Sequence, residues 1–538
     1  MRLRCVGVAC VLAVIGLGLH ARPAVAGAIP VCGNGELEAG EECDDGSLNG
    51  VSGACCTANC VRNGMSPDVI VGDIPSAMRH GNVGGITAYS IGSTSCNVGN
   101  CWLNWIANTA EHPLIGQSMY RLKDGRFEQV GQSWLKHGFG ATTGSLCGTC
   151  NPPPDQTRLG VNCSDPYEAF LNGMQGGMGP KVDVNPATGV FPYPDSRIQL
   201  EGNAIFKRLQ VHDADLDPFL NPGALYFFEA QYVTHDDATA QKNGNNVSYR
   251  RATVGAAPLF LPTTVDTTQR GRAGIEAWKA TDPAVTQVAL KGADGTFILA
   301  AKATPIPGGL YHYEYAVQNL TNNRAARSFT VPIPPGATIT RVDFHDVDYH
   351  SGEPFVGTDW TATVTATSVS WATQPFDVQP NANALRWGTL YNFRFDANVA
   401  PGVSAVTLGL FKPGSPATVS AVTVTPSACG ALPSEVREDV QLAPGEGGTT
   451  ITWTPASGSA TSSVLRGTVA QLPVGPGGGD EICLETDIAG SSATDPEDPD
   501  PGTAFWYLVR GENDCGDGTY GVASESGVLT PRSSTTCP

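Results

Sequence analysis

The stretch 31–60 constrains the fold of this chain more than any other segment, because it cannot fold around an apolar core. Its thirty residues, VCGNGELEAGEECDDGSLNGVSGACCTANC, contain five cysteines and six acidic residues. Segments of this size usually need disulfides or a bound metal ion to hold a fold. The sequence therefore predicts a small module held together by disulfide bonds, by a metal ion or by both.

A secretory signal is predicted at residues 1–26, directly before this module. Arg2 and Arg4 supply a basic start, residues 5–19 form an apolar run, and residues 24–26 read Ala-Val-Ala, a small-residue cleavage site. No later apolar run reaches the length of a membrane span. We therefore expect a secreted protein, extracellular or at the cell surface, without a transmembrane segment.

Export favours disulfides as the state of the remaining cysteines. The fourteen cysteines after residue 26 form three clusters, which are Cys32, Cys43, Cys55, Cys56 and Cys60, then Cys96, Cys101, Cys147, Cys150 and Cys163, then Cys429, Cys483, Cys515 and Cys537. Two adjacent clusters of five require a bridge between them or one free thiol in each. We expect the bridge.

A zinc site is the alternative for part of the second cluster. His137 with Cys147, Cys150 and Cys163 has the ligand types that zinc prefers. In an exported chain, however, we expect these cysteines to be oxidised.

Composition and charge indicate the fold class. The chain of 538 residues has 64 glycines, 40 prolines and only 15% charged residues, which favours short strands and turns over long helices. A net charge of −19 would repel nucleic acid, whereas it is compatible with divalent cations or simply with solubility. We expect a mostly β protein, with multi-domain β-sandwiches after the small disulfide-rich N-terminal module.

The motifs of the N-terminal module resemble two known families. C-G-N, G-E-E-C-D and the C-C pair resemble the opening of the disintegrin-like module of metalloproteinases, and C-D-D-G also resembles short cysteine-rich repeats of secreted bacterial proteins. The disintegrin-like resemblance implies a structural Ca²⁺, for which a flexible acidic loop can supply six to eight oxygens. It assigns side-chain ligands to Asn34, Glu38, Glu41 and Asp44, and backbone carbonyl ligands to Val31 and Glu36. A solvated acidic loop held by disulfides is the alternative.

The resemblance covers only about thirty residues, and it departs from the family in two ways. Asp45-Gly46 stands where the family has Cys-Gly, and the longer remainder of the module with its integrin-facing loop is missing. The chain also lacks the H-E-x-x-H motif of zinc proteases. We therefore expect neither integrin binding nor protease activity.

Turn-rich junctions predict the domain plan. The Cys-rich calcium-binding module spans 27–65, one β-sandwich spans 66–256, a second spans 257–424 and forms one unit with the first as an alternative, and the last domain spans 425–538. Core strands are expected at 449–455 with a buried Trp453, and at 464–466 and 505–510, so that this last part resembles a fibronectin type III-like sandwich. Its acidic segment 495–500 is predicted to be a solvated turn.

One acidic stretch in the second sandwich carries candidate catalytic residues. Residues 343–350 read DFHDVDYH, and on a strand Asp346, Asp348 and His350 would share one face. These residue types suit a metal ion or an acid–base pair. A polar strand edge without a chemical role gives the same pattern.

Two further acidic stretches are expected to be structural. Asp213, Asp215 and Asp217 alternate like a strand face or the start of a calcium loop, but Pro218 stands where an EF-hand loop needs glycine. The segments 235–237 (HDD) and 244–246 (GNN) are predicted to belong to a polar surface loop.

These observations favour a secreted binding or adhesion protein with a structural calcium site, whose central sandwich binds an extracellular glycan or a cell-surface protein. One alternative is a secreted carbohydrate-active enzyme, a lyase or hydrolase, that uses the 343–350 cluster. Another is a structural protein of a surface layer or matrix. The sequence has no phosphate-binding glycine loop and no G-x-S-x-G motif. A paired-carboxylate glycosidase stays open, because its two acids can lie far apart in the sequence.

Overall fold

This computed structural model describes residues 31–34, 40–62, 64–427, 432–436, 440–445, 447–471, 481–513, 516–525, 528–532, 534, 536 and 537. The chain is mostly β, as expected, and divides into one unit that ends at Asn63 and a second that begins at Gly64. Within the described ranges, no helix combines the length and the apolar character needed to cross a bilayer. The predicted signal at 1–26 lies outside the described residues.

Cysteines form the core of the N-terminal unit. Its described regular element is a short 3-10 helix, η1 (Gly46–Leu48). The buried cluster consists of Cys43, Cys56 and Cys60, and disulfides join Cys32 to Cys60 and Cys43 to Cys56. The expected disulfide-held module is therefore confirmed for these two bonds.

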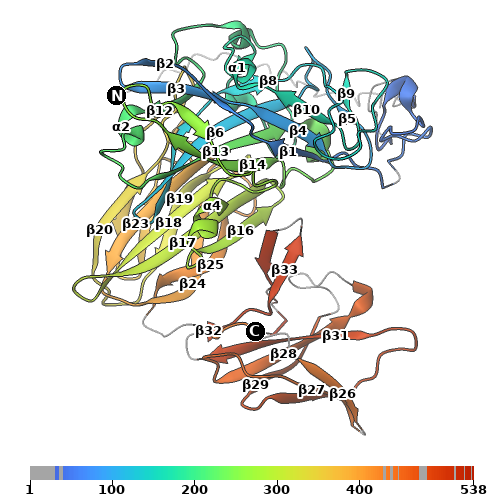
Figure 1. Cartoon of the computed structure of the whole chain (residues 1–538). Helices are drawn as coiled ribbons and strands as arrows, with labels where there is room; N and C mark the ends of the chain where they lie inside the picture. Colours follow the sequence, from blue (N-terminus) through green and yellow to red (C-terminus); the bar gives the residue numbers. More distant parts are fainter. Residues whose placement is uncertain are drawn as a thin grey trace, which may run out of the picture. The chain divides into compact units, whose positions relative to one another are not determined.

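The second unit begins with two sheets that pack face to face (Figure 1). A three-stranded sheet has the order β1-β4-β10, with bounds Val69–Asp73, Ser93–Asn97 and Ser164–Tyr167. A ten-stranded sheet follows the order β15-β14-β13-β6-β7-β12-β3-β2, with bounds Pro262–Thr264, Val247–Val254, Leu225–Val233, Leu114–Lys123, Arg126–Gln132, Leu209–His212, Ile86–Ile91 and Ala77–Val83. Off this path, β8 (Leu135–His137) pairs with β6 and β11 (Met178–Gly179) pairs with β8.

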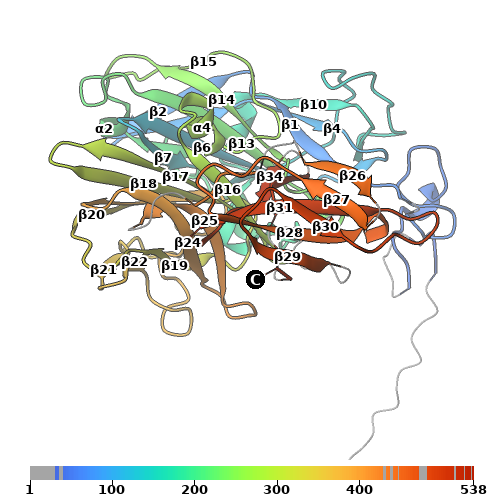
Figure 2. The same ribbon diagram turned by 90° about the horizontal axis from the view of Figure 1, so that it is seen from below.

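Two five-stranded sheets follow along the chain. The first has the order β16-β17-β18-β23-β20, with bounds Thr286–Gly292, Gly295–Ile306, Leu310–Asn319, Thr389–Ala397 and Ile339–His345. The second has the order β21-β22-β19-β24-β25, with bounds Thr361–Val364, Ser368–Ala372, Ala326–Pro332, Pro401–Leu410 and Thr418–Pro426. Figure 2 shows β17 and β18 between the layer of β13 and β14 and the layer of β19 and β22.

Short elements complete this region. A two-stranded sheet pairs β5 (Leu103–Asn104) with β9 (Arg158–Leu159). The helical turns are α1 (Ala169–Asn172), η2 (Lys181–Asp183), η3 (Ser196–Gln199), α2 (Asp213–Leu216), α3 (His235–Thr239) and α4 (Glu276–Thr281). Asp213 and Asp215 therefore lie on a helical turn, where Asp213 accepts hydrogen bonds from Asn82 and Thr87 and Asp215 pairs with Arg121.

Alternating side chains explain why the four sheets stack as layers, because successive residues of a strand point to opposite faces. On β13, Phe228 packs between the three-stranded and ten-stranded sheets, while Phe227 packs against the first five-stranded sheet. On β17, Ile298 packs back toward the ten-stranded sheet, and Leu299 packs toward the second five-stranded sheet. The two inner sheets thus bury both faces.

The second cysteine cluster stabilises the edge of this stack. Disulfides join Cys96 to Cys147 and Cys150 to Cys163, which confirms the oxidised state and rules out a zinc site made of these thiolates. Cys55 and Cys101 are each disulfide-bonded as well, so the alternative of one free thiol in each cluster is wrong.

The described residues of the C-terminal region form a seven-stranded sandwich with a further hairpin. Its sheets have the orders β26-β27-β30 (Gln441–Gly445, Gly448–Thr452, Ser492–Asp495) and β29-β28-β31-β32 (Ile482–Ile488, Thr461–Thr468, Phe505–Asn513, Gly516–Asp517). The hairpin pairs β33 (Val522–Glu525) with β34 (Val528–Pro531), and η4 (Val469–Gln471) follows β28. Two sheets of three and four strands fit the fibronectin type III-like resemblance.

In this sandwich the predicted burial of Trp453 is confirmed, whereas the predicted exposure of Asp495 is not. Trp453 is buried in its core, as predicted. Asp495, predicted to begin a solvated turn, is instead completely buried, and both of its oxygens accept hydrogen bonds of 2.9 Å from the Arg466 guanidinium. The prediction was wrong for Asp495, because the cation that makes its burial tolerable lies on another strand. Residues 496–498 and 500 are exposed, as predicted.

Candidate functional site

The candidate catalytic stretch lines a cavity of about 390 Å³ at the rim between the ten-stranded sheet and the first five-stranded sheet. We call this cavity the β20 pocket. Its lining consists of Ile86, Gln129, Val130, Gln210, His212 and Asp215 from the ten-stranded sheet and α2, together with residues 344–350 and Asp359. The volume is within the range of small-molecule sites. The structure thus brings Asp346, Asp348 and His350 to one pocket.

These three residues were expected to meet because they share one face of a strand, and this reason was wrong. Strand β20 ends at His345, so Asp346, Asp348 and His350 do not share a strand face. The chain instead leaves the first five-stranded sheet and crosses over the ten-stranded one. Gln132 Nε2 donates to the Asp348 carbonyl at 2.9 Å, and Trp134 Nε1 donates to the His350 carbonyl at 3.3 Å. Side chains of the other sheet therefore replace a neighbouring strand as partners of this segment.

His350 is held in one orientation by both ring nitrogens. Nε2 lies 2.7 Å from the Gln132 carbonyl oxygen, which can only accept, so Nε2 carries the proton. Nδ1 lies 2.9 Å from Ser351 Oγ, which also accepts a hydrogen bond from the backbone N–H of Lys207. Burial, and secondarily the charge of Lys181, lower the pKa of His350 to about 4. These contacts suit a structural role rather than proton transfer to a ligand.

Asp346 is the pocket carboxyl with a perturbed proton affinity. Burial raises its pKa to about 6, the Asn383 hydrogen bond opposes this rise, and the nearby Asp359 and Asp348 carboxylates add to it. The Asn383 amide that donates to Asp346 is itself fixed, because Asn383 Oδ1 accepts a hydrogen bond of 2.6 Å from Tyr391. Asp346 is therefore a positioned carboxyl that changes protonation near pH 6.

Asp348 and His212 form the exposed rim of the pocket. His212 Nε2 lies 2.8 Å from Asp348 Oδ2, and the two side chains are 52% and 74% exposed. An ion pair with this exposure contributes little to stability. Both groups are consequently accessible to a ligand.

Sequence reasoning missed several pocket residues. His212 and Gln210 on β12, and Gln129 on β7, lie more than 100 residues from the 343–350 stretch, and nothing in their local sequence marks them. His345 belongs to the stretch but was not chosen as a candidate. Its buried Nε2 has no hydrogen-bond partner among the described groups. Only the fold could bring these residues together.

Close groups of three or more His, Cys, Asp and Glu side chains occur at one place among the described residues. There, one group of three His, Cys, Asp or Glu side chains has its ligand atoms within 4.8 Å of one another, namely Cys32, Glu41 and Cys60. The two sulfurs of this group form a disulfide, so they are not thiolate ligands. The described lining of the β20 pocket does not contain such a group.

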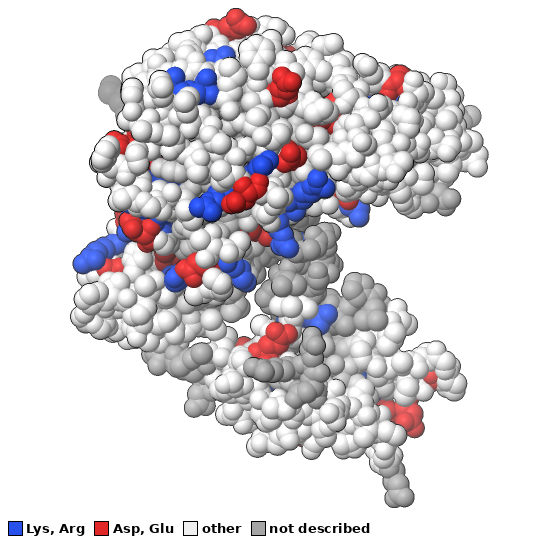
Figure 3. All heavy atoms as spheres, in the orientation of Figure 1, with Lys and Arg blue, Asp and Glu red and all other residues white. Residues whose placement is uncertain are grey.

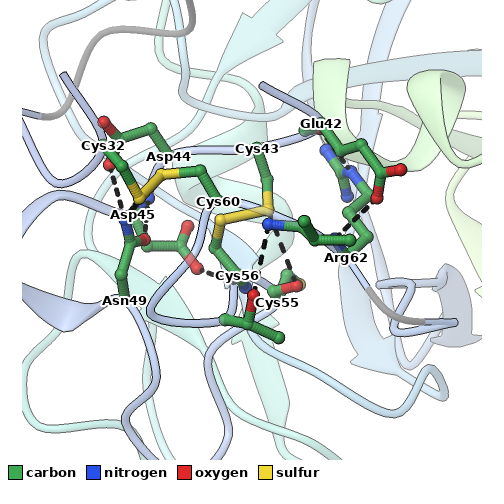
Figure 4. Close-up of a disulfide and its surroundings, with 12 residues drawn as sticks. Cys32, Glu42, Cys43, Asp44, Asp45, Asn49, Cys55, Cys56, Cys60 and Arg62 are labelled. Atoms are coloured by element: carbon green, nitrogen blue, oxygen red, sulfur yellow. Dashed lines mark hydrogen bonds between the residues drawn. A yellow bond between two sulfur atoms is a disulfide. The ribbon is translucent and has the colours of Figure 1, made fainter. Parts of the chain in front are cut away.

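In the N-terminal unit, Asp44 closes the loop that was predicted to hold calcium (Figure 4). Asp44 Oδ2 accepts from the backbone N–H groups of Gly33 and Asn34 at 2.9 and 3.0 Å. Its Oδ1 accepts from the Gly46 N–H at 2.7 Å and from Asn49 Nδ2 at 3.0 Å. Four donors occupy the acceptor sites of this carboxylate, so Asp44 fits a loop clamp better than a calcium ligand.

The other predicted calcium ligands divide into two groups. Val31 and Asn34 are exposed and Glu41 is half-buried, whereas Glu36 and Glu38 lie outside the described residues. Apart from Asp44, Glu41 is therefore the predicted carboxylate ligand that the structure describes.

The charged side chains on one face of the molecule do not indicate a second site. On the face shown in Figure 3, acidic and basic side chains are intermixed rather than separated into patches of one sign. The net charge of −19 is thus a property of the whole chain, and on this face it does not mark a docking surface.

Comparisons with known proteins give no family. No family model and no curated protein matches this chain. Two of the similar solved structures are the FN1–FN3 domains of chicken CNTN1 (11% identity, 84% of this chain and 95% of that chain, TM-score 0.15) and the major pilin RrgB from Streptococcus pneumoniae (11% identity, 78% of this chain and 60% of that chain, TM-score 0.16). TM-scores this low do not establish a common fold.

Proposed function

We propose that this chain is an extracellular binding protein and that the β20 pocket binds a hydroxyl-rich ligand, such as a unit of a glycan. The disulfides of the described residues fit an oxidising compartment outside the cytosol. The single observation that carries the proposal is the convergence of carboxyl, amide and imidazole groups from two sheets on one cavity of about 390 Å³.

The lining chemistry narrows the class of glycan. Carboxylates of Asp215, Asp348 and Asp359 can accept hydrogen bonds from hydroxyl groups, and so can the amide oxygen of Gln210, whose nitrogen donates to the Ile205 carbonyl. The Gln129 amide is fully buried and already bonded within the protein, so it shapes the pocket without contacting a ligand. Phe344 and Tyr349 add apolar surface against which a sugar ring can pack. Because the lining is rich in carboxylates, we expect neutral or amino sugars and not sulfated or uronic acid polymers.

A glycan array with the full chain tests this proposal. We expect reproducible hits without release of product, and at least tenfold weaker binding for Asp348→Ala because a rim carboxylate is lost. Asp377→Ala, at an exposed aspartate outside the pocket lining, is the matched control and should bind normally. Hits confined to acidic glycans, or equal binding by Asp348→Ala, would contradict the proposed site.

A carbohydrate-active hydrolase or lyase is the second candidate function, and the raised pKa of Asp346, about 6, favours it. A carboxyl with this proton affinity can act as a general acid in mildly acidic solution. The purified chain should then release product from a polysaccharide panel, with a rate that falls above pH 6 as Asp346 loses its proton. Asp346→Asn should abolish release and retain binding. Binding without product at every pH between 4 and 8 would exclude this function.

The proposal also includes a structural Ca²⁺ in the N-terminal unit, with Glu41 as a ligand and Asp44 as the clamp that shapes the loop. A chelator should lower the melting temperature of this unit, and Glu41→Gln should remove the sensitivity. Asp44→Asn should destabilise the unit even in chelator, because an amide cannot accept all four hydrogen bonds that Asp44 accepts. A melting curve that a chelator leaves unchanged would refute the calcium part alone.

A further inference from the structure

The loop between β13 and β14 contains a buried carboxylate that the polar-loop prediction does not explain. Asp237 lies on α3, and its side chain is completely buried. Its Oδ1 accepts a hydrogen bond of 3.0 Å from the backbone N–H of Val69 at the start of β1. An ionised carboxylate at such a position requires compensation by donors or by a cation.

A second carboxylate and an amide lie next to Asp237. Asp68 directly precedes Val69, and its Oδ1 accepts a hydrogen bond of 3.0 Å from Asn245 Nδ2. Burial raises the pKa of both carboxyl groups, and the charge of Asp68 raises that of Asp237 further. The two acids therefore repel each other within one partly desolvated site.

Buried oxygens at this place lack hydrogen-bond donors. Asp237 Oδ2 and Asn245 Oδ1 are both inaccessible and have no hydrogen-bond partner among the described groups. The same is true of Oδ1 of the neighbouring Asn246, whose amide nitrogen donates to the Tyr232 carbonyl. Natural proteins rarely leave several buried acceptors unsatisfied together, so something else must satisfy them.

Buried water could bond these oxygens, but it would not offset the charge of the two acids, whereas three kinds of positive charge could. A proton on Asp237 would satisfy one oxygen at most. The Lys242 ammonium acts on both carboxyl groups from a distance, yet it forms no ion pair with either of them in the described part of the chain. A divalent cation accounts for more of the observations, because it binds several oxygens at once and offsets the charge of both acids.

We infer that Asp68, Asp237 and Asn245 form a calcium site in the central region, separate from the candidate site of the N-terminal unit. Side-chain oxygens of these three residues are the ligand type that Ca²⁺ prefers, and backbone carbonyls or water complete such sites. With two carboxylates, we expect a dissociation constant of about 10⁻⁴–10⁻³ M, as in extracellular calcium modules. Binding would fix the β13–β14 loop against the start of β1.

Calcium titration of the full chain tests this inference, with Glu41→Gln as the background so that the N-terminal candidate site does not contribute. After treatment with chelator and its removal, calorimetric titration with CaCl₂ should show one bound ion, and millimolar calcium should raise the melting temperature. Adding Asp237→Asn should weaken binding at least tenfold and remove the rise. Asp266→Asn, at an exposed aspartate paired with Arg251, is the matched control and should keep both.

Two more measurements keep the inference testable if Asp237→Asn does not fold. Asp68→Asn removes the less buried of the two carboxylates and should weaken calcium binding in the same way. In the Glu41→Gln chain, calcium should slow hydrogen exchange of the amides in residues 235–246. Absence of binding, or exchange that calcium leaves unchanged, would overturn the site.

Lys242→Met distinguishes a cation site from a lysine counter-charge. If calcium occupies the site, this variant should bind it as well or better, because a competing positive charge is gone. If Lys242 is the natural partner of the two acids, the variant should lose stability and should show no calcium binding, which would overturn the inference.

Discussion

Asp346 and His350 lie four residues apart in one segment, yet burial moves their pKa values in opposite directions. Burial raises the pKa of Asp346 to about 6 and lowers that of His350 to about 4, because in each case it disfavours the charged form. As the pH rises from 4 to 6, the folded chain loses stability through Asp346, whose unfolded form has already given up its proton. Over the same range the folded chain gains stability through His350. At low pH the unfolded chain binds a proton on His350 that folding must remove, and this cost falls as the pH rises.

Substitution of Asp346 separates the two contributions. We expect Asp346→Asn to raise the free energy of unfolding at pH 7 by about 1–2 kcal/mol, because an amide avoids burying the charge, and to have little effect at pH 4. Urea unfolding at both pH values measures this. Asp377→Asn is the control, and an Asp346→Asn effect of equal size at pH 4 and pH 7 would contradict the raised pKa.

On the scale of elements, a buried arginine joins the two inner sheets. Arg394 on β23 contacts Glu314 on β18 at 3.0 Å and Glu128 on β7 of the ten-stranded sheet at 2.7 Å. Its side chain is 5% exposed, and the two carboxylates are 3% and 9% exposed. Removal of one partner from such a network leaves buried charges uncompensated, which is far more costly than loss of a surface pair.

We therefore expect Arg394→Met to lower the free energy of unfolding by about 3–5 kcal/mol. Arg251→Met is the matched control, because Arg251 pairs with Asp266 at 3.5 Å on the surface and should contribute about 1 kcal/mol or less. Urea denaturation of both variants provides the comparison. Similar losses would mean that the buried network does not stabilise the contact between the sheets.

The elements were largely predictable from sequence, whereas their long-range partners were not. The many apolar residues of 381–398 are typical of core strands, and β23 is buried along its whole length. Arg394 in the same segment contacts Asp343 of the 343–350 stretch at 3.2 Å. Its buried partner Glu128 lies 266 residues away in the sequence, and no local sequence pattern predicts such a contact.

The same limit applies to the candidate sites. Residue types alone identified the 343–350 stretch, but the strand that was to align its side chains ends at His345. Burial of Asp237 was missed for a related reason. A pair of aspartates beside glycine and asparagine is typical of exposed loops, and the Val69 N–H that accommodates Asp237 comes from β1.

For the molecule as a whole, the odd number of cysteines in each of the first two clusters predicts a disulfide between the clusters. With Cys32–Cys60, Cys43–Cys56, Cys96–Cys147 and Cys150–Cys163 paired, each cluster has one further disulfide-bonded cysteine, Cys55 and Cys101 respectively.

Peptide mapping without reduction should find a peptide that contains Cys55 linked to one that contains Cys101. Cys55→Ser should then release a thiol at Cys101, whereas a linkage of either residue to Cys429 or Cys515 would refute the predicted bridge.

The layered stack has a practical consequence for anyone who wishes to produce part of this protein. If the chain were divided between residues 256 and 257, Phe127 and Phe227 would be exposed to solvent on an uncovered sheet. Their packing partners Ile298 and Leu390 belong to the other fragment. It would also split the β20 pocket, which takes His212 from one fragment and Asp346 from the other. Either piece expressed alone should therefore aggregate, and co-expression of the two is the condition under which ligand recognition could be recovered.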